Sequence, residues 1–172
     1  AVRRGMIVSG EYITHLALSA QKTIESFMDT RLACLTLGDA GAALILEGTH
    51  DRQAGFRDIE LRTFGGYSHF CIAKMTKEDG IIMYTDSVNM TEAAIKSGAK
   101  NALQVLQRAA WPPDSFQHLI MHQTSGMTLN SARQEINRLL KSNICHDGNT
   151  INNVEQRGNT ASTSHFIAVA DH

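Results

Sequence analysis

The chain has 172 residues, of which 42% are hydrophobic and 19% are charged, and its 16 Lys and Arg nearly balance its 17 Asp and Glu. This composition is typical of a globular domain with a sizeable core, and it excludes a disordered linker or a collagen-like rod. The balanced charge gives no reason to expect binding to nucleic acid or to an anionic membrane surface. The longest apolar run, residues 40–46, is far shorter than the ~20 residues that a membrane span needs.

Cysteine usage indicates a reducing compartment. The three cysteines, Cys34, Cys71 and Cys145, are too sparse and odd in number for a disulfide framework. A Cys-x-x-Cys pair does not occur, so a structural zinc site has no support. The first residues lack the apolar core of a secretory signal. We therefore expect a cytoplasmic protein with no bound metal.

The first part of the chain alternates between short apolar runs and polar turns. Residues 5–10 form an apolar run bounded by glycines, which predicts a buried strand. Residues 11–28 have mixed helical character. Residues 33–37 and 42–47 are strand-like, and apolar residues alternate with charges over residues 56–64, which predicts a strand with one wet face.

Two amphipathic helices dominate the rest. Apolar residues recur at helical spacing over residues 91–110, with Ser87 and Asn89 as candidate N-caps. A short strand is predicted over residues 116–121, and residues 161–170 predict a final helix of small residues. Between them lies a second amphipathic helix, whose apolar face consists of Leu129, Ala132, Ile136 and Leu139. This order predicts a layered α/β architecture with partly parallel strands.

The ends of the chain fit two interpretations. The sequence opens on a predicted strand, closes on a predicted helix and does not begin with methionine. Such ends fit a fragment of a larger sheet, and they fit equally well a complete small α/β domain with tight termini.

The first candidate site residue is His122, which follows the predicted strand and precedes the turn into the next helix. In open α/β sheets, ligands collect outside the carboxyl ends of strands. An imidazole there can donate an N–H to a reacting oxygen or move a proton near neutral pH. The alternative is a lone histidine that caps a loop. His118 lies four residues earlier, but on a strand this spacing does not build a metal site.

The second candidate is Asn159, within Gly158-Asn159-Thr160. Glycine permits a tight turn with positive φ, and the small residues that follow let a helix pack close to other backbone. Asn159 would then point its side-chain amide N–H, a donor that does not titrate, at the carbonyl oxygen of a ligand. The alternative is ordinary turn chemistry, in which an asparagine bonds its own backbone.

Other conspicuous residues are assigned structural roles. The glycine-rich segment at residues 37–43 matches neither the dinucleotide fingerprint nor the P-loop, so its glycines are expected to permit close packing and Asp39 to cap a turn. Cys34 and Cys71 lie among apolar residues and are expected to be buried, and Cys145 lies in a turn. The sequence therefore offers no convincing nucleophile and no cofactor motif.

The order of three motifs resembles the β-ketoacyl-(acyl carrier protein) synthase III family of the thiolase-like superfamily. Gly38-Asp39-Ala40-Gly41-Ala42 comes first, His122-Gln123 follows, and Gly158-Asn159-Thr160 opens a small-residue helix. The resemblance runs from about Arg4 to the end of the chain and covers the second half or so of a family member. It implies a partial thiolase-like fold with α-β-α layers.

This resemblance also implies domains, chemistry and partners. Residues 1–50 would end the first thiolase-like half, and residues 51–172 would form the second half without its last strands. In the family, the residues that match His122 and Asn159 complete a Cys-His-Asn triad for decarboxylative condensation of acyl thioesters in fatty acid or polyketide synthesis. The nucleophilic cysteine would lie outside this chain. The implied substrates are acyl-CoA or acyl carrier protein thioesters, with no cofactor, and the implied assembly is a homodimer or a pair with a chain that carries the missing half.

Three alternatives stay open. Family members commonly continue the His-Gln pair with Ala-Asn and a basic residue that docks acyl carrier protein, whereas this chain has Thr124-Ser125-Gly126-Met127. A related acyltransferase that uses another thioester donor would fit this departure. A non-catalytic binding or assembly subunit would keep the pair and lack the nucleophile. Accidental similarity would leave His122 and Asn159 far apart.

Overall fold

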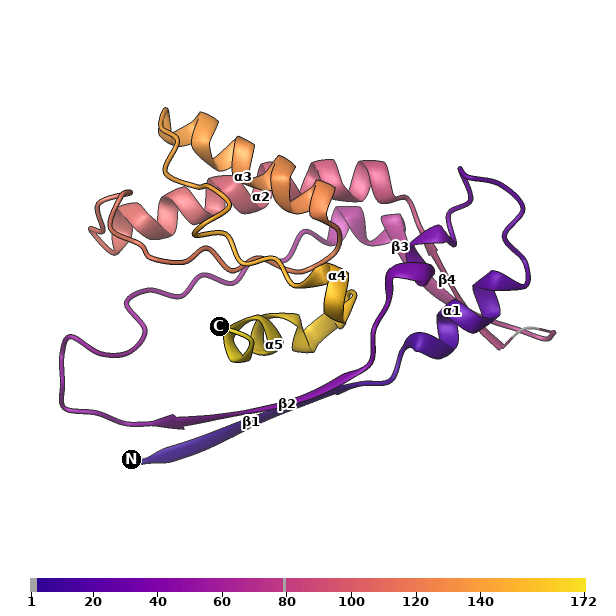
Figure 1. Cartoon of the computed structure of the whole chain (residues 1–172), viewed down its shortest axis with the longest axis horizontal. Helices are drawn as coiled ribbons and strands as arrows, with labels where there is room; N and C mark the ends of the chain where they lie inside the picture. Colours follow the sequence, from indigo (N-terminus) through magenta and orange to yellow (C-terminus); the bar gives the residue numbers. More distant parts are fainter. Residues whose placement is uncertain (1–2, 79) are drawn as a thin grey trace.

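The structure of the protein is a computed structural model that describes residues 3–78 and 80–172. It has a mixed α/β fold, as the sequence predicts. In chain order the elements are β1 (Arg4–Glu11), α1 (Thr14–Gln21), the 3-10 helix η1 (Leu32–Thr36), β2 (Ala40–Glu47), the 3-10 helix η2 (Gly65–Phe70), β3 (Cys71–Thr76), β4 (Gly80–Thr85), α2 (Ser87–Arg108), α3 (Gly126–Leu140), α4 (Val154–Arg157), the 3-10 helix η3 (Ala161–Thr163) and α5 (Ser164–Ala170). Helices α2 and α3 lie side by side, and the β1–β2 ribbon runs along the opposite side of the molecule (Figure 1).

Strands β1 and β2 form an antiparallel ribbon, which confirms the first and third strands predicted in the opening part of the chain. The burial predicted for residues 5–10 is wrong, because β1 is largely exposed. The register pairs Arg4 with Glu47 at one end and Glu11 with Ala40 at the other. An exposed ion pair of 2.8 Å between Arg4 and Glu47 joins the two strands at the first of these ends.

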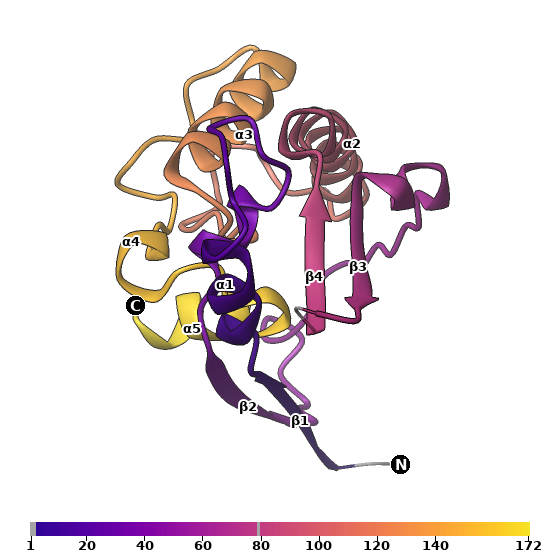
Figure 2. The same cartoon turned by 90° about the vertical axis from the view of Figure 1, so that its right-hand side faces the viewer.

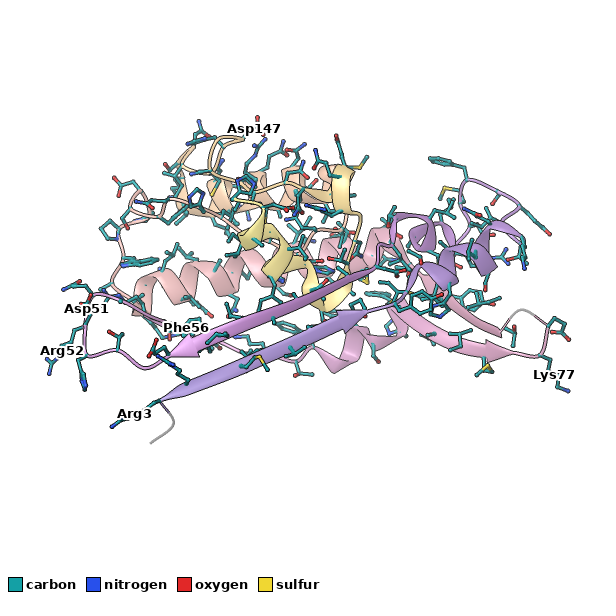
Figure 3. The ribbon with its side chains drawn as sticks, turned by 60° about the horizontal axis from the view of Figure 1, so that its bottom comes forward. Arg3, Asp51, Arg52, Phe56, Lys77 and Asp147 are labelled. Carbon is teal, nitrogen blue, oxygen red and sulfur yellow. The ribbon has the colours of Figure 1, made fainter. Side chains whose placement is uncertain are left out.

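Both faces of this ribbon carry exposed apolar side chains. Met6 and Val8 stand on one face of β1 and are each 67% exposed, and Ile7 on the other face is 45% exposed. Figure 3 shows side chains projecting from both sides of the ribbon, with Arg3 beside the start of β1. Because an antiparallel sheet normally buries one face, the ribbon presents a surface suited to further packing.

Helix α1 begins against the glycine-rich segment. The Asp39 carboxylate accepts the backbone N–H groups of Ile13, at 2.6 Å, and Thr14, at 2.8 Å, and it also accepts the Thr14 hydroxyl at 2.6 Å. These bonds satisfy donors that a helix start leaves open, and they hold the pKa of Asp39 below its usual value. Asp39 therefore caps the start of α1, 25 residues earlier in the chain, whereas the prediction was that it caps a turn.

Two predicted elements near α1 are different in the structure. The helical character predicted through residue 28 is wrong, because the helix ends at Gln21 and the Thr23 hydroxyl donates to the Ala20 carbonyl oxygen at 3.4 Å. The strand predicted at residues 33–37 is also wrong. There the chain forms the 3-10 helix η1. Local hydrogen bonds, such as that from the Thr36 hydroxyl to the Ala33 carbonyl oxygen at 2.9 Å, replace pairing with a neighbouring strand.

The alternating segment at residues 56–64 is extended but belongs to no strand, so that prediction is wrong. Its two acidic residues, Asp58 and Glu60, pair with an arginine of α2. Arg108 lies 2.7 Å from a carboxylate oxygen of Asp58 and 2.7 Å from one of Glu60. The alternation therefore serves ion pairing with a helix rather than the two faces of a sheet.

Helix α2 starts earlier than predicted. Its N-cap is Asp86, whose carboxylate accepts the Asn89 backbone N–H at 3.1 Å, so the prediction of Ser87 or Asn89 as the cap is wrong. All three residue types cap helices well, and the sequence therefore does not select among them. Among the helices of the described residues, α2 included, none is both long and apolar enough to cross a membrane.

Two buried clusters lie on either side of the molecule's centre. The first is formed by Leu16, Ala20 and Cys34, and the second by Ala99, Ile136 and Cys145. The apolar face predicted for α3 is confirmed at Leu129 and Ile136, which are 3% and 8% exposed. Burial of Cys34 is confirmed as well.

The predicted burial of Cys71 is wrong. This residue begins β3 and is exposed. Strand β3 pairs antiparallel with β4, and β4 lies between β3 and α1 in Figure 2. The side chains of β3 therefore have little protein to pack against, although their apolar sequence resembles a core strand.

Parallel pairing is confined to two isolated bridges among the described residues. One joins Leu37 to Asn159 and the other joins Leu119 to Thr150, whereas both named strand pairs are antiparallel. The strand predicted at residues 116–121 is thus reduced to the single bridge at Leu119, because one residue of that run has a ladder partner.

Gly38 lies where no side chain fits, as expected for close packing. A Cβ there would lie 2.2 Å from the Arg157 carbonyl oxygen and 3.2 Å from Thr160 Cγ2. We expect Gly38→Ala to lower the free energy of unfolding in urea by about 1–3 kcal/mol, because the two segments must separate. Gly41→Ala is the matched control, since a Cβ on Gly41 meets nothing within 4 Å. Equal losses in the two variants would contradict the close approach.

Candidate functional site

His122 lies on an extended segment that leads from the bridge at Leu119 to helix α3. The Leu119 N–H donates to the Asn149 carbonyl oxygen at 2.7 Å, and its carbonyl accepts the Ile151 N–H at 3.0 Å. Helix α3 begins after Ser125, whose side chain caps it. The predicted order of extended segment, histidine, turn and helix is therefore present, and His122 is exposed.

The Gln123 side chain holds this segment in place through hydrogen bonds to the backbone. Its side chain is 1% exposed. The Nε2 group donates to the carbonyl oxygens of Met121, at 2.9 Å, and Ile151, at 3.1 Å, and Oε1 accepts the Asn153 N–H at 3.1 Å. A buried amide that is bonded at both ends fixes the backbone around it, so Gln123 sets the course of the chain next to His122.

Asn159 stands on a turn that is bonded to the glycine-rich segment. Its N–H donates to the Thr36 carbonyl oxygen at 2.7 Å, and its carbonyl accepts the Gly38 N–H at 3.0 Å. Gly158 before it has a φ of +69°, and a Cβ there would lie 2.9 Å from the Thr36 oxygen. Glycine is therefore required at that position. The structure brings the first and last of the sequence motifs together.

The Asn159 side chain makes a hydrogen bond within its own turn, which the sequence analysis gave as the alternative to ligand binding. Its Oδ1 accepts the Ala161 N–H at 3.0 Å. Because a backbone N–H must face an acceptor, this bond identifies the oxygen of the amide. The Nδ2 group, for which residues 3–78 and 80–172 supply no hydrogen-bond partner, is left as a donor. Turn chemistry and ligand binding are thus compatible in one side chain.

The single helix predicted at residues 161–170 is split into η3 and α5. Ala161, the first residue of η3, takes a positive φ of 45°. The following small residues Thr163 and Ser164 are 0% and 1% exposed, so this segment packs closely against other backbone.

His165 on α5 is a candidate site residue that the sequence did not reveal. Its ring lies against that of His122, with centroids 5.9 Å apart and planes inclined by 24°. Partial loss of hydration lowers the pKa of His122, and positive charge on His165 lowers it further. Loss of hydration also lowers the pKa of His165. Both rings are therefore held toward their neutral forms.

These residues join the two buried clusters. Met121, directly before His122, packs against the second cluster. Leu37, the bridge partner of Asn159, packs against the first. His165, six residues after Asn159, then reaches across to His122.

Other chemistry in the described residues lies away from these side chains. Burial raises the pKa of the Cys34 and Cys145 thiols, which disfavours the thiolate form. Two surface hollows of about 430 and 320 Å³ lie along α3 and are not lined by His122 or Asn159. Within residues 3–78 and 80–172, no group of three or more His, Cys, Asp or Glu could hold a metal ion.

No protein-family profile matches the chain. Two curated proteins from Helicobacter pylori strains, both named β-ketoacyl-(acyl carrier protein) synthase III, are each 21% identical over 183 residues. The chain resembles β-ketoacyl synthase III. Each match covers 99% of this chain and 53% of the relative, so the chain spans about half the length of these synthase III proteins.

Solved structures show the same likeness in fold. Synthase III from Pseudomonas aeruginosa PAO1 superposes with a TM-score of 0.76 at 16% identity, over 98% of this chain and 48% of the other. OleA from Xanthomonas campestris, with bound lauric acid and lauroyl-CoA, gives a TM-score of 0.78 at 17% identity, over 99% and 49%. Synthase III from Thermus thermophilus gives 0.75 at 19% identity, over 99% and 50%. The chain therefore has a thiolase-like α/β fold that corresponds to about half of these structures.

Proposed function

We propose that this chain is part of a synthase III-like acyltransferase that condenses acyl thioesters with loss of carbon dioxide. His122 and Asn159 would together stabilise the enolate, and the nucleophilic cysteine would lie outside this chain. One observation carries the proposal furthest. The His122 ring stacks, at 5.9 Å, on His165 of α5, which follows the Asn159 turn after the short helix η3.

In the proposed reaction a cysteine thiolate attacks an acyl thioester, takes the acyl group and releases the first thiol. A malonyl-type thioester then loses carbon dioxide, and the electrons of the broken C–C bond move into an enolate. The enolate carbon attacks the bound acyl carbonyl, which forms the new C–C bond and returns the cysteine as thiolate. Negative charge develops on the thioester oxygen of the extender during the decarboxylation step.

Two N–H donors suit this charge. The Asn159 amide donates at any pH, and its Oδ1 is already bonded, so Nδ2–H is the group available to the oxyanion. A His122 held neutral by its lowered pKa donates one N–H, and this proton is far less acidic toward the carbanion than a proton of an imidazolium would be. Preorganised donors of this kind are worth about 3–4 kcal/mol each, because they bond the transition state better than the ground state.

In this proposal, the remaining catalytic residues lie on polypeptide outside residues 1–172. Residues 1–50 would end one thiolase-like half and residues 51–172 would form most of the second, with the exposed β1–β2 ribbon covered by the remaining half or by a partner chain. The raised pKa of the Cys34 and Cys145 thiols disfavours these two residues as the nucleophile. Acyl-CoA or acyl carrier protein thioesters would be the substrates, and three free cysteines suit a cytoplasmic setting for fatty acid or polyketide synthesis.

The test is an assay of the polypeptide that contains this chain, isolated with any subunit that co-purifies. We expect carbon dioxide release from malonyl-CoA that depends on added acyl-CoA, with a β-ketoacyl product. Acyl-CoA binding with neither acylation nor carbon dioxide release would contradict the enzyme and support a non-catalytic subunit. Acyl transfer without carbon dioxide release would instead support a transferase with another thioester donor.

A further inference from the structure

His165 is exposed, but the helix that carries it is anchored by buried neighbours. The residues on either side of its turn, Ser164 and Ala168, are 1% and 0% exposed, and the Thr163 hydroxyl donates to the Thr160 carbonyl oxygen at 2.7 Å. These contacts fix the register of α5. This register places His165 on the side of α5 that faces His122, where the two rings lie with centroids 5.9 Å apart.

We propose that His165 is a positioning residue that keeps His122 uncharged and oriented by stacking a second imidazole against it. This inference rests on the proposed function, in which a neutral His122 donates an N–H to an oxyanion. Two imidazoles at this separation act on each other in two ways. Their faces pack together, and a proton on one ring opposes a proton on the other.

Other charged groups do not compete for this role among the described residues. His165 is the single titratable group whose charge changes the pKa of His122. The first turns of α3 and α5 carry no acidic side chain that could stabilise an imidazolium. Asp171, at the end of α5, is paired with Arg157 at 2.7 Å. Removal of the second ring should therefore act directly on His122.

The direction of the effect follows from these causes. A neutral residue at position 165 removes the opposing charge and lets the pKa of His122 rise. The partial dehydration of His122 persists when the replacement is an aromatic ring and weakens when the replacement is small and polar. The pKa of His122 should therefore increase from the native protein to His165→Phe and further to His165→Asn.

The experiment is a pH titration of histidine ring signals by NMR, on the native chain and on these two variants. His118→Phe is the matched control, because His118 is exposed and has no ring contact with His122. We expect His122 to shift upward in both His165 variants and to stay unchanged in the control.

An unchanged His122 titration in both His165 variants, with backbone spectra that show a folded chain, would overturn the proposal. So would an equal shift in His118→Phe. The titration needs no substrate, so its outcome is independent of the carbon dioxide assay. Coupled titration in a chain whose parent protein releases no carbon dioxide would support the imidazole pair and overturn the proposed function.

Discussion

His122→Ala and Asn159→Ala are each expected to slow carbon dioxide release from malonyl-CoA about 100- to 1,000-fold in the enzyme that contains this chain. The reason is that each variant removes one N–H from an oxyanion that forms during decarboxylation. Transfer of the acyl group from acyl-CoA to the cysteine should fall much less, since that step does not develop the enolate. Both half-reactions can be measured, the first as carbon dioxide and the second as acyl-enzyme by mass spectrometry.

Matched controls keep the comparison specific. His118→Ala removes an exposed imidazole four residues before His122, and Asn143→Ala removes an exposed carboxamide after α3. Neither should change either half-reaction. Equal losses of acylation and decarboxylation in the His122 and Asn159 variants would show that the residues act on the whole site and not on the enolate.

Gln123→Leu is expected to lower the free energy of unfolding by about 3–5 kcal/mol, measured by urea denaturation. Leucine nearly fills the same volume but leaves three polar groups without a partner, which are the carbonyls of Met121 and Ile151 and the N–H of Asn153. Each unsatisfied buried group costs about 1–3 kcal/mol.

The control for this change is Gln134→Leu on α3, where the side chain is exposed and helix propensity is retained. Its stability should change by no more than about 0.5 kcal/mol. A loss in Gln123→Leu as small as in this control would contradict the anchoring role. In the parent enzyme, the same variant should also weaken decarboxylation, because the backbone next to His122 would lose its position.

The sequence predicted those elements whose signal lies within the element itself. Helix α3 carries its apolar residues at helical spacing, and Leu129 and Ile136 are buried as that spacing requires. The ribbon of β1 and β2 follows from apolar runs bounded by glycine. The close packing at Gly38 and the capping by Asp39 also followed from residue chemistry, although the segments they contact could not be named from the sequence.

The failures share a different cause. Residues 56–64 alternate like a strand, but their charges pair with Arg108 of α2, and the partner decides the structure. Residues 116–121 are extended, but the single strand-like pairing there is the bridge at Leu119. Cys71 has apolar neighbours in the sequence, but it lies on a strand that little protein covers. Strand formation and burial depend on neighbours distant in sequence, and local pattern does not specify them.

The candidate site shows the same division. His122 and Asn159 were predicted as site residues from motif order and the family that this order resembles, and their roles stay predictions. His165 and the anchoring role of Gln123 were not found, since ring stacking at 5.9 Å and a bond from residue 123 to residue 153 exist through the fold alone.

The most direct test of the account is an experimental structure of the parent enzyme with a β-ketoacyl-CoA product or an enolate analogue bound. We predict one ligand oxygen within about 2.7–3.1 Å of both His122 Nε2 and Asn159 Nδ2. A thioester oxygen that contacts neither nitrogen, with the two side chains facing separate surfaces, would contradict the shared oxyanion site on which the proposed function depends.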